Sequence, residues 1–179
     1  MPENAPEIVA DKLQTELANI EFERANITDG SPWSSNSFVN DLNLPECLKN
    51  ALYDLKVDRL SKIQKVVIPK LIAGENVVAQ SQSGTGKTIT FLVAAFQKVD
   101  PELFHTQVLI VLPTLELALQ VCHVAEHIGK NNPEVRVRQV LRKERIEADL
   151  KEHIIIGTPG KLLELILRMR RIDCSQLRM

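Results

Sequence analysis

Apolar positions along the chain form two kinds of pattern that alternate with each other. Short continuous apolar runs occupy residues 77–79, 108–112 and 154–156, and a partly alternating run occupies residues 135–141. Such runs are typical of strands, and the continuous ones of strands buried on both faces. Longer stretches with helical spacing separate them. This alternation predicts an α/β fold, with a parallel sheet covered by helices on both faces.

The helical stretches have recognisable ends. Apolar spacing indicates helices over residues 45–55, 114–130 and 157–169, and one after the Gly-rich segment that ends near residue 87. A short polar helix is expected over residues 144–151. Another helix is expected to begin at the cap Ser61 and to end at Gly74, with a kink at Pro69. In a parallel sheet, ligand sites lie beyond the carboxyl ends of the strands, and the loops described below lie there.

The first 36 residues differ from the rest. Residues 1–30 carry seven Asp and Glu against two Lys and Arg and include one marginal amphipathic helix, and residues 30–36 resemble a linker. From Arg136 onward there are eleven Lys and Arg against six Asp and Glu. The basic part could attract the acidic part, meet phosphate, or be an ordinary solvated surface. We predict an acidic extension over residues 1–36 and a domain over residues 37–179.

Composition narrows the class of protein. The chain has 179 residues, 44% of them hydrophobic, which is enough for one core, and no apolar run approaches the roughly eighteen residues of a membrane span. Its three cysteines are scattered, so we expect an intracellular protein without a disulfide framework. The formal net charge of −1 argues against nucleic-acid binding through bulk charge.

Residues 75–91 have the order of a phosphate-binding loop: an apolar run, a Ser/Gly segment, a lysine and threonine, and a helix-forming stretch. Gly84 and Gly86 permit left-handed backbone angles, so that backbone N–H groups can converge on an anion. Lys87 is placed to reach the outer phosphates, and the Thr88 hydroxyl to bind Mg²⁺. Ser81 stands where the usual pattern has its first glycine. The alternative interpretation is a flexible turn with a surface lysine.

Three further segments have suitable chemistry beside such a loop. Gln64 offers both a donor and an acceptor, which reading an adenine edge requires. Thr114 and Thr158 each follow a predicted strand and begin a helix, where a hydroxyl and free N–H groups can hold a phosphate oxygen. Pro159 is preset for the first helical position.

Together these segments resemble the Q motif and motifs I, Ia and Ib of DEAD-box RNA helicases, from about Phe38 to the C-terminus. The resemblance implies a RecA-like P-loop domain that uses ATP and Mg²⁺ and grips RNA by its backbone without reading sequence. It implies a catalytic role for Lys87 and Thr88, with Thr88 as the metal ligand. The implied cofactor-binding residues are Phe38, Val57, Gln64, Ser81, Gln82, Ser83, Gly84, Thr85, Gly86, Lys87 and Thr88, and the implied RNA-binding residues are Pro113, Thr114, Glu116, Thr158, Pro159, Gly160 and Lys161.

Residues 61–64 and 81–88 are most similar to helicases of mRNA export at the nuclear pore, and so is the acidic extension. This similarity implies nuclear-pore or mRNA-export partners and a cytoplasmic or nuclear location. Val57 stands where the family has an aromatic residue against the adenine, so weaker base stacking is expected. Leu60 replaces a proline, and Leu115 replaces an arginine of motif Ia.

The sequence contains no Asp-Glu pair. The Asp-Glu-Ala-Asp motif, which in the family positions Mg²⁺ and water, is therefore absent, and we expect the RecA-like domain to be incomplete at its C-terminus. Two interpretations remain: the ATP- and RNA-binding part of a helicase, acting in mRNA export or RNP remodelling, or a short non-catalytic nucleotide- or RNA-binding regulatory module.

Overall fold

The computed structural model describes residues 34–141 and 144–179, which belong to one compact unit, Trp33–Met179. The predicted acidic extension therefore lies mostly outside the described residues, and the division at residue 36 stays a prediction. In the part of the chain that the structure describes, no helix is long and apolar enough to cross a membrane.

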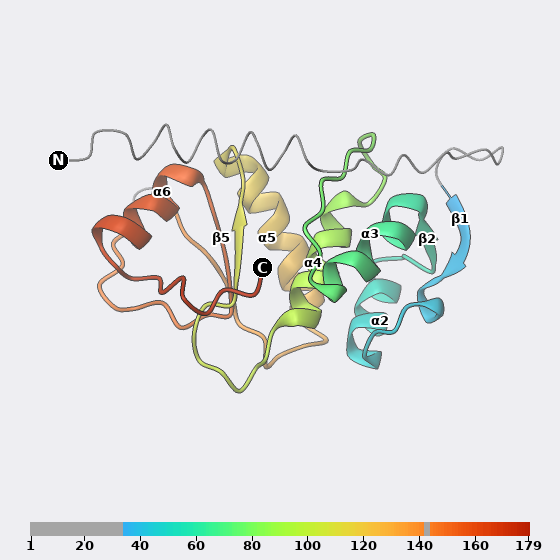
Figure 1. The fold of residues 1–179 in the computed structure, drawn as a ribbon, viewed down its shortest axis with the longest axis horizontal. Coiled ribbons are helices and arrows are strands. Elements are labelled where there is room, and N and C mark those ends of the chain that lie inside the picture. The colour runs from blue at the N-terminus through green and yellow to red at the C-terminus, as the bar shows by residue number, and fades with distance from the viewer. Residues whose placement is uncertain (1–33, 142–143) are drawn as a thin grey trace. The chain divides into compact units, whose positions relative to one another are not determined.

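The described elements alternate largely as expected (Figure 1). In chain order they are β1 (Ser34–Phe38), a 3-10 turn (Val39–Asp41), α2 (Glu46–Asp54), β2 (Arg59–Ser61), α3 (Lys62–Ala73), α4 (Lys87–Lys98), β3 (Val108–Val111), α5 (Leu115–Gly129), β4 (Val137–Gln139), β5 (Ile154–Gly157), α6 (Pro159–Leu163) and one π-helical turn (Glu164–Arg168).

The central sheet is parallel, in the order β3-β5-β4. Alternate residues of β5 face opposite sides: Ile154 and Ile156 pack in a core with α4 and α5, whereas Ile155 packs in a second cluster with α6. In Figure 1, β5 accordingly lies between α5 and α6. The parallel sheet with helices on both faces is confirmed.

The end of the chain lies along the free edge of β3. The N–H of Arg178 donates to the carbonyl of Gln107 at 2.7 Å, and the N–H of Leu109 donates to the carbonyl of Met179 at 3.0 Å. These bonds satisfy backbone groups at the start of β3.

Several predicted elements differ in the structure. The prediction of a strand over residues 77–79 is wrong. Residues 75–80 are irregular, and no described strand pairs with them. Val78 is 57% exposed. The short helix expected over residues 144–151 is also wrong. Its residues are irregular, and Ile146 and Leu150 are buried in the second cluster. Pro69 lies inside α3, which continues through it to Ala73.

Strand β1 includes residues 34–36, the last part of the predicted linker, so the linker prediction is wrong there. Strand β1 pairs antiparallel with β2, and Phe38 lies opposite Arg59 in the register. The ribbon is short and carries mostly polar residues, so its apolar periodicity is weak. It places Phe38 and Arg59 side by side.

Candidate functional site

The phosphate-binding loop leads directly into α4, as the sequence predicts. Gly84 and Gly86 have φ of +81° and +85°, in the left-handed region that glycine tolerates best, and Gly86 caps the helix that begins at Lys87. Helix α4 is anchored in the core by its buried residues from Leu92 to Phe96. A rigid helix thus presents its N-terminal N–H groups at the end of the loop.

The loop is held by hydrogen bonds between its own groups. The Lys87 ammonium donates to the carbonyl of Ser81 at 2.6 Å and to the carbonyl of Gln82. The Thr85 hydroxyl donates to the carbonyl of Gln82 at 2.9 Å and lies 2.5 Å from the Ser81 hydroxyl. A phosphate that binds Lys87 therefore replaces carbonyl acceptors that the loop itself supplies.

Gln64 connects α3 to this loop. Its Oε1 accepts a hydrogen bond from the N–H of Ser61 at 2.8 Å, and its own N–H donates to the Ser61 hydroxyl at 3.4 Å, which completes a capping box. The side chain is 3% exposed. A Cβ at Gly86 would lie 2.5 Å from Gln64 Nε2, so the amide packs directly against the loop backbone. The sequence placed Gln64 beside adenine, but did not indicate this contact.

A pocket of about 300 Å³ lies where these segments meet. Five of the predicted cofactor-binding residues line it: Val57, Gln64, Gly84, Thr85 and Gly86. Five lining residues were not predicted as site residues: Lys56, Arg59, Leu60, Ser61 and Ile89.

Phe38 is not among the residues that line this pocket. Instead, the Arg59 guanidinium lies over its ring, 5.0 Å from the ring centroid. The other predicted cofactor residues lie in the adjoining loop and at the start of α4: Ser81, Gln82, Ser83, Lys87 and Thr88.

The two predicted RNA-binding segments follow neighbouring strands. Val111, at the end of β3, is the register partner of Gly157, at the end of β5. Thr114 caps α5, with its hydroxyl accepting from the N–H of Leu117 at 3.3 Å. Thr158 caps α6 without using its side chain, and Pro159 is the first residue of that helix. The two helix starts therefore lie next to each other at the carboxyl ends of β3 and β5. Pro113, Glu116, Pro159 and Gly160 are exposed there.

Lys161 differs from the other predicted RNA-binding residues, because it is buried, with 5% exposed. Its ammonium donates to the carbonyl of Glu144 at 3.0 Å and to Oε2 of Glu164 at 3.3 Å. Contact with RNA would require it to leave both partners. In this structure Lys161 holds the loop before β5 against α6.

The Glu144 side chain also connects this loop to Arg138 in β4. Its carboxylate accepts from the N–H of Leu141 and from the Arg138 guanidinium, which also pairs with Glu152 at 3.1 Å. Burial acts to raise the pKa of Glu144, but the bonds from Leu141 and Arg138 outweigh it and hold the pKa below its ordinary value.

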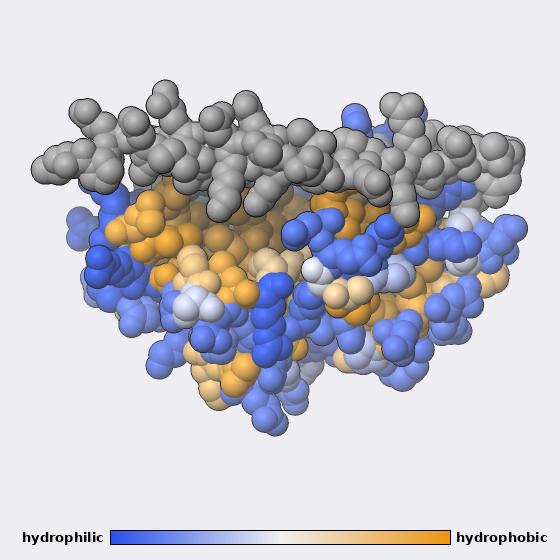
Figure 2. Space-filling view, in the orientation of Figure 1, coloured by the Kyte–Doolittle hydropathy of each residue, from blue (hydrophilic) through white to orange (hydrophobic). Residues whose placement is uncertain are grey.

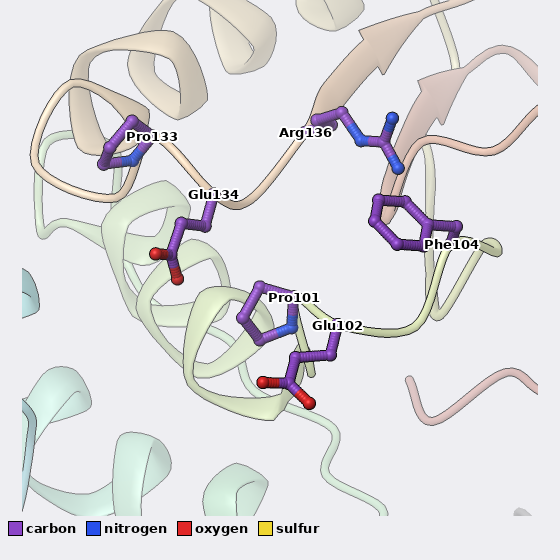
Figure 3. A pocket seen from close by; sticks show the side chains of 6 residues that line it. All are labelled: Pro101, Glu102, Phe104, Pro133, Glu134 and Arg136. Carbon is purple, nitrogen blue, oxygen red and sulfur yellow. The ribbon is translucent and has the colours of Figure 1, made fainter.

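A second pocket, of about 450 Å³, contains none of the predicted site residues (Figure 3). Arg136 lies over the ring of Phe104, 4.7 Å from its centroid, and the remaining lining residues are Pro101, Glu102, Pro133 and Glu134. Among the described residues, no group of three or more His, Cys, Asp or Glu could hold a metal ion. Thr88, the predicted metal ligand, is the second residue of α4, and its role stays a prediction.

Comparison with protein families supports the assignment of these motifs. Residues 61–179 match the model of the DEAD/DEAH box helicase family. The chain belongs to this family. It is 40% identical over 151 residues to the DEAD-box helicase Dbp80 of Drosophila melanogaster, covering 82% of this chain and 33% of that protein. It is 38% identical over 152 residues to the ATP-dependent RNA helicase DDX19A of Bos taurus, covering 83% and 32%. This DEAD-box chain thus spans about a third of the length of these relatives.

Solved structures of the DEAD-box family have the same fold. Dbp5 of S. cerevisiae bound to RNA and ADP BeF3 is 30% identical, with a TM-score of 0.73 over 78% of this chain and 36% of that one. A DEAD box protein from Methanococcus jannaschii is 29% identical, with a TM-score of 0.71 over 78% and 39%. The expected RecA-like fold is therefore confirmed.

The space-filling view shows apolar and polar side chains intermixed on one face of the molecule (Figure 2).

Proposed function

We propose that this chain is the ATP- and RNA-binding part of a DEAD-box ATP-dependent RNA helicase that acts in mRNA export or RNP remodelling. The observation that carries the proposal is the packing of Gln64 against Gly86, because it joins the adenine-reading segment and the phosphate loop around one pocket. A nucleotide with its base at Gln64 and its phosphates at Lys87 would span the two.

The chain's own residues would act as follows. The N–H groups at the start of α4 and the Lys87 ammonium bind the phosphates, after Lys87 leaves the carbonyls of Ser81 and Gln82. The Thr88 hydroxyl would hold Mg²⁺, which neutralises phosphate charge when bound. Gln64 would orient the base while its Oε1 keeps the Ser61 cap or exchanges that bond for one to adenine.

RNA would bind at the two adjacent helix starts. The Thr158 hydroxyl has no capping bond and is available to a phosphate or ribose oxygen, and Thr114 begins the neighbouring helix. Contacts of this kind position a backbone without reading bases. Pro113, Glu116, Pro159 and Gly160 complete the proposed surface, whereas Lys161 acts through the position of α6.

The partners are proposed by similarity. A Dbp5 variant of S. cerevisiae bound to Nup159, Gle1, IP6 and ADP is 30% identical, with a TM-score of 0.71 over 75% of this chain and 36% of that one. We therefore propose that this chain has partners at the nuclear pore and a cytoplasmic or nuclear location. Because its sequence lacks an Asp-Glu pair, we expect nucleotide binding without RNA-stimulated hydrolysis.

Nucleotide binding is tested by titrating a fluorescent ATP analogue against the wild type, Lys87→Ala and the control Lys65→Ala, which removes an exposed lysine of α3. Binding should be lost in Lys87→Ala and kept in Lys65→Ala. Equal affinity of the wild type and Lys87→Ala would refute the phosphate-loop assignment. ATP hydrolysis that disappears with Lys87→Ala would contradict the expected lack of turnover.

RNA binding is tested by fluorescence anisotropy of a labelled single-stranded RNA. Thr158→Glu should weaken binding by charge repulsion. Ser175→Glu is the matched control, because it adds the same charge at an exposed position of the C-terminal segment. That segment is hydrogen-bonded to the start of β3, at the opposite end of the sheet from Thr158. Equal RNA affinity of the two variants would overturn the proposed surface.

A further inference from the structure

The second pocket, of about 450 Å³, lies at the amino ends of the sheet strands. Its lining residues come from two loops: Pro101, Glu102 and Phe104 precede β3, and Pro133, Glu134 and Arg136 precede β4 (Figure 3). Thr114 and Thr158 follow the carboxyl ends of β3 and β5, so the proposed RNA surface is at the opposite end of the sheet. Among the described residues, the pocket shares none of its lining with the pocket beside Gln64.

A buried amide fixes the loop that precedes β3. The side chain of Gln107 is 0% exposed, and its Nε2 donates to the carbonyls of Asp100 at 2.7 Å and Leu103 at 3.1 Å. Its Oε1 accepts from the N–H of Asp100 at 2.9 Å. These bonds hold the backbone on both sides of Pro101 and Glu102. This wall of the pocket is therefore preformed, and a ligand does not have to order it.

The loop that precedes β4 is held in a similar way. The side-chain amide of Asn132 donates to the carbonyl of Ile128, in the last turn of α5, at 3.0 Å. The N–H of Val135 donates to the carbonyl of Asn132 at 3.0 Å, which closes a turn over Pro133. Proline fixes its own φ and stiffens this turn further. Both walls of the pocket are thus rigid.

Phe104 supplies an aromatic ring to the pocket and is 64% exposed. The Arg136 guanidinium carbon lies 4.7 Å from the ring centroid, and the buried ring of His153 lies 6.5 Å from it, centroid to centroid. The ring is therefore supported by two neighbours while most of its surface stays open. A large exposed apolar group of this kind is typical of surfaces that bind other proteins.

The charges that line the pocket are not balanced within it. The Arg136 guanidinium lies on the Phe104 ring and donates to the carbonyl of Lys151 at 3.3 Å. Among the described residues, the carboxylates of Glu102 and Glu134 form no hydrogen bond or ion pair. Figure 3 shows both of them pointing away from Arg136. The charge left open to a ligand is therefore negative, which favours a cation and disfavours a phosphate group.

We propose that this pocket binds a basic segment of a partner protein, in which a Lys or Arg side chain stands next to an apolar one. The cation pairs with Glu102 and Glu134, and the apolar side chain packs on the ring of Phe104 and on Pro101 and Pro133. The inference does not depend on the proposed function, because the residues that carry it bind neither nucleotide nor RNA in that proposal.

A random heptapeptide library displayed on phage and selected on the immobilised chain supplies the probes. The selected peptides are labelled with fluorescein and titrated by anisotropy against the wild type and its variants. They should contain Lys or Arg next to an apolar residue and should bind Phe104→Ala at least about tenfold more weakly. Leu167→Ala is the matched control, because it removes an apolar side chain that is 68% exposed in the π-helical turn, and it should bind as the wild type does.

The carboxylates are tested as a pair. Glu102→Gln combined with Glu134→Gln should weaken peptide binding by about tenfold, and high salt should remove most of that difference. Glu75→Gln combined with Glu147→Gln makes the same change in net charge at two exposed positions outside the pocket and should leave affinity unchanged. Thermal melts of every variant report whether the fold is kept.

Three outcomes would overturn the inference: no selected peptide that depends on Phe104, a selection dominated by acidic peptides, or equal affinity of the two double variants. The affinity for single-stranded RNA should be the same in both double variants. A gain in RNA affinity only in the variant that lacks Glu102 and Glu134 would assign the pocket to nucleic acid instead. Nucleotide binding that does not depend on Lys87 would refute the proposed function and leave this inference standing.

Discussion

The contact between Gly86 and Gln64 can be measured through a pair of matched substitutions. Gly84 and Gly86 have nearly the same left-handed φ, +81° and +85°. Alanine at either position pays the left-handed cost of about 1–2 kcal/mol, less a gain of about 0.4–1 kcal/mol from a stiffer unfolded chain. These contributions are common to both sites. The surroundings differ, because a Cβ at Gly84 would meet nothing within 4 Å.

At Gly86 the added Cβ would lie 2.5 Å from Gln64 Nε2 and 3.2 Å from its Cδ. Gln64 is buried and its amide oxygen is bonded to the N–H of Ser61, so it cannot move without breaking the cap. Overpacking of this kind costs about 1–3 kcal/mol. Gly86→Ala should therefore be less stable than Gly84→Ala by about 1–3 kcal/mol.

Urea denaturation followed by circular dichroism gives the free energy of unfolding, and the two variants are compared only where their m-values agree. In thermal melts the difference should correspond to about 2–4 °C per kcal/mol for a chain of this size. Removing the amide by Gln64→Ala should make the two glycine substitutions equally costly. Equal stability of Gly84→Ala and Gly86→Ala in the presence of Gln64 would refute the packing argument.

Three further predictions concern backbone strain, protonation and thiol reactivity. Lys56 has φ of +62°, so Lys56→Gly should raise the free energy of unfolding by about 0.5 kcal/mol and Lys56→Ala should not; a stabilising alanine would contradict this. Burial, then the charges of Arg136 and His105, lowers the pKa of His153 from its ordinary 6.5, and its Nδ1 accepts from the N–H of Arg136 at 3.0 Å. The folded state therefore favours the neutral ring, and stability should fall as pH drops below about 6.5, with a limiting slope of about 1.4 kcal/mol per pH unit. His153→Asn should flatten this slope in melts recorded between pH 7.5 and about pH 5, the exposed His123→Asn should not, and an unchanged slope in His153→Asn would count against the argument. Burial, with Glu126 beside it, raises the pKa of Cys122 to about 11, so Ellman's reagent should label the exposed Cys174 first and reach Cys122 only on unfolding; rapid labelling of Cys122 in the native chain would disprove its protection.

Local chemistry explains which parts of the site could be predicted from the sequence. The glycines, lysine and threonine of residues 84–88 have a required order, and the helix after them follows from its own apolar spacing. Ser61 and Gln64 form a capping box that is visible as a pattern of four residues. Thr114 and Thr158 both stand at helix starts, as predicted, although only the Thr114 hydroxyl makes a capping bond.

The tertiary structure decided what depends on partners distant in sequence. The apolar run at residues 77–79 is not a strand, because a strand requires a paired neighbour and spacing alone cannot supply one. Lys161 resembles a phosphate-binding residue in sequence, yet Glu144 and Glu164 engage it in a buried position. Phe38 and Arg59 are 21 positions apart, and only the pairing of β1 with β2 brings them together. The sequence by itself thus determined the motifs and the family, whereas strand pairing and burial decided which side chains reach the pocket.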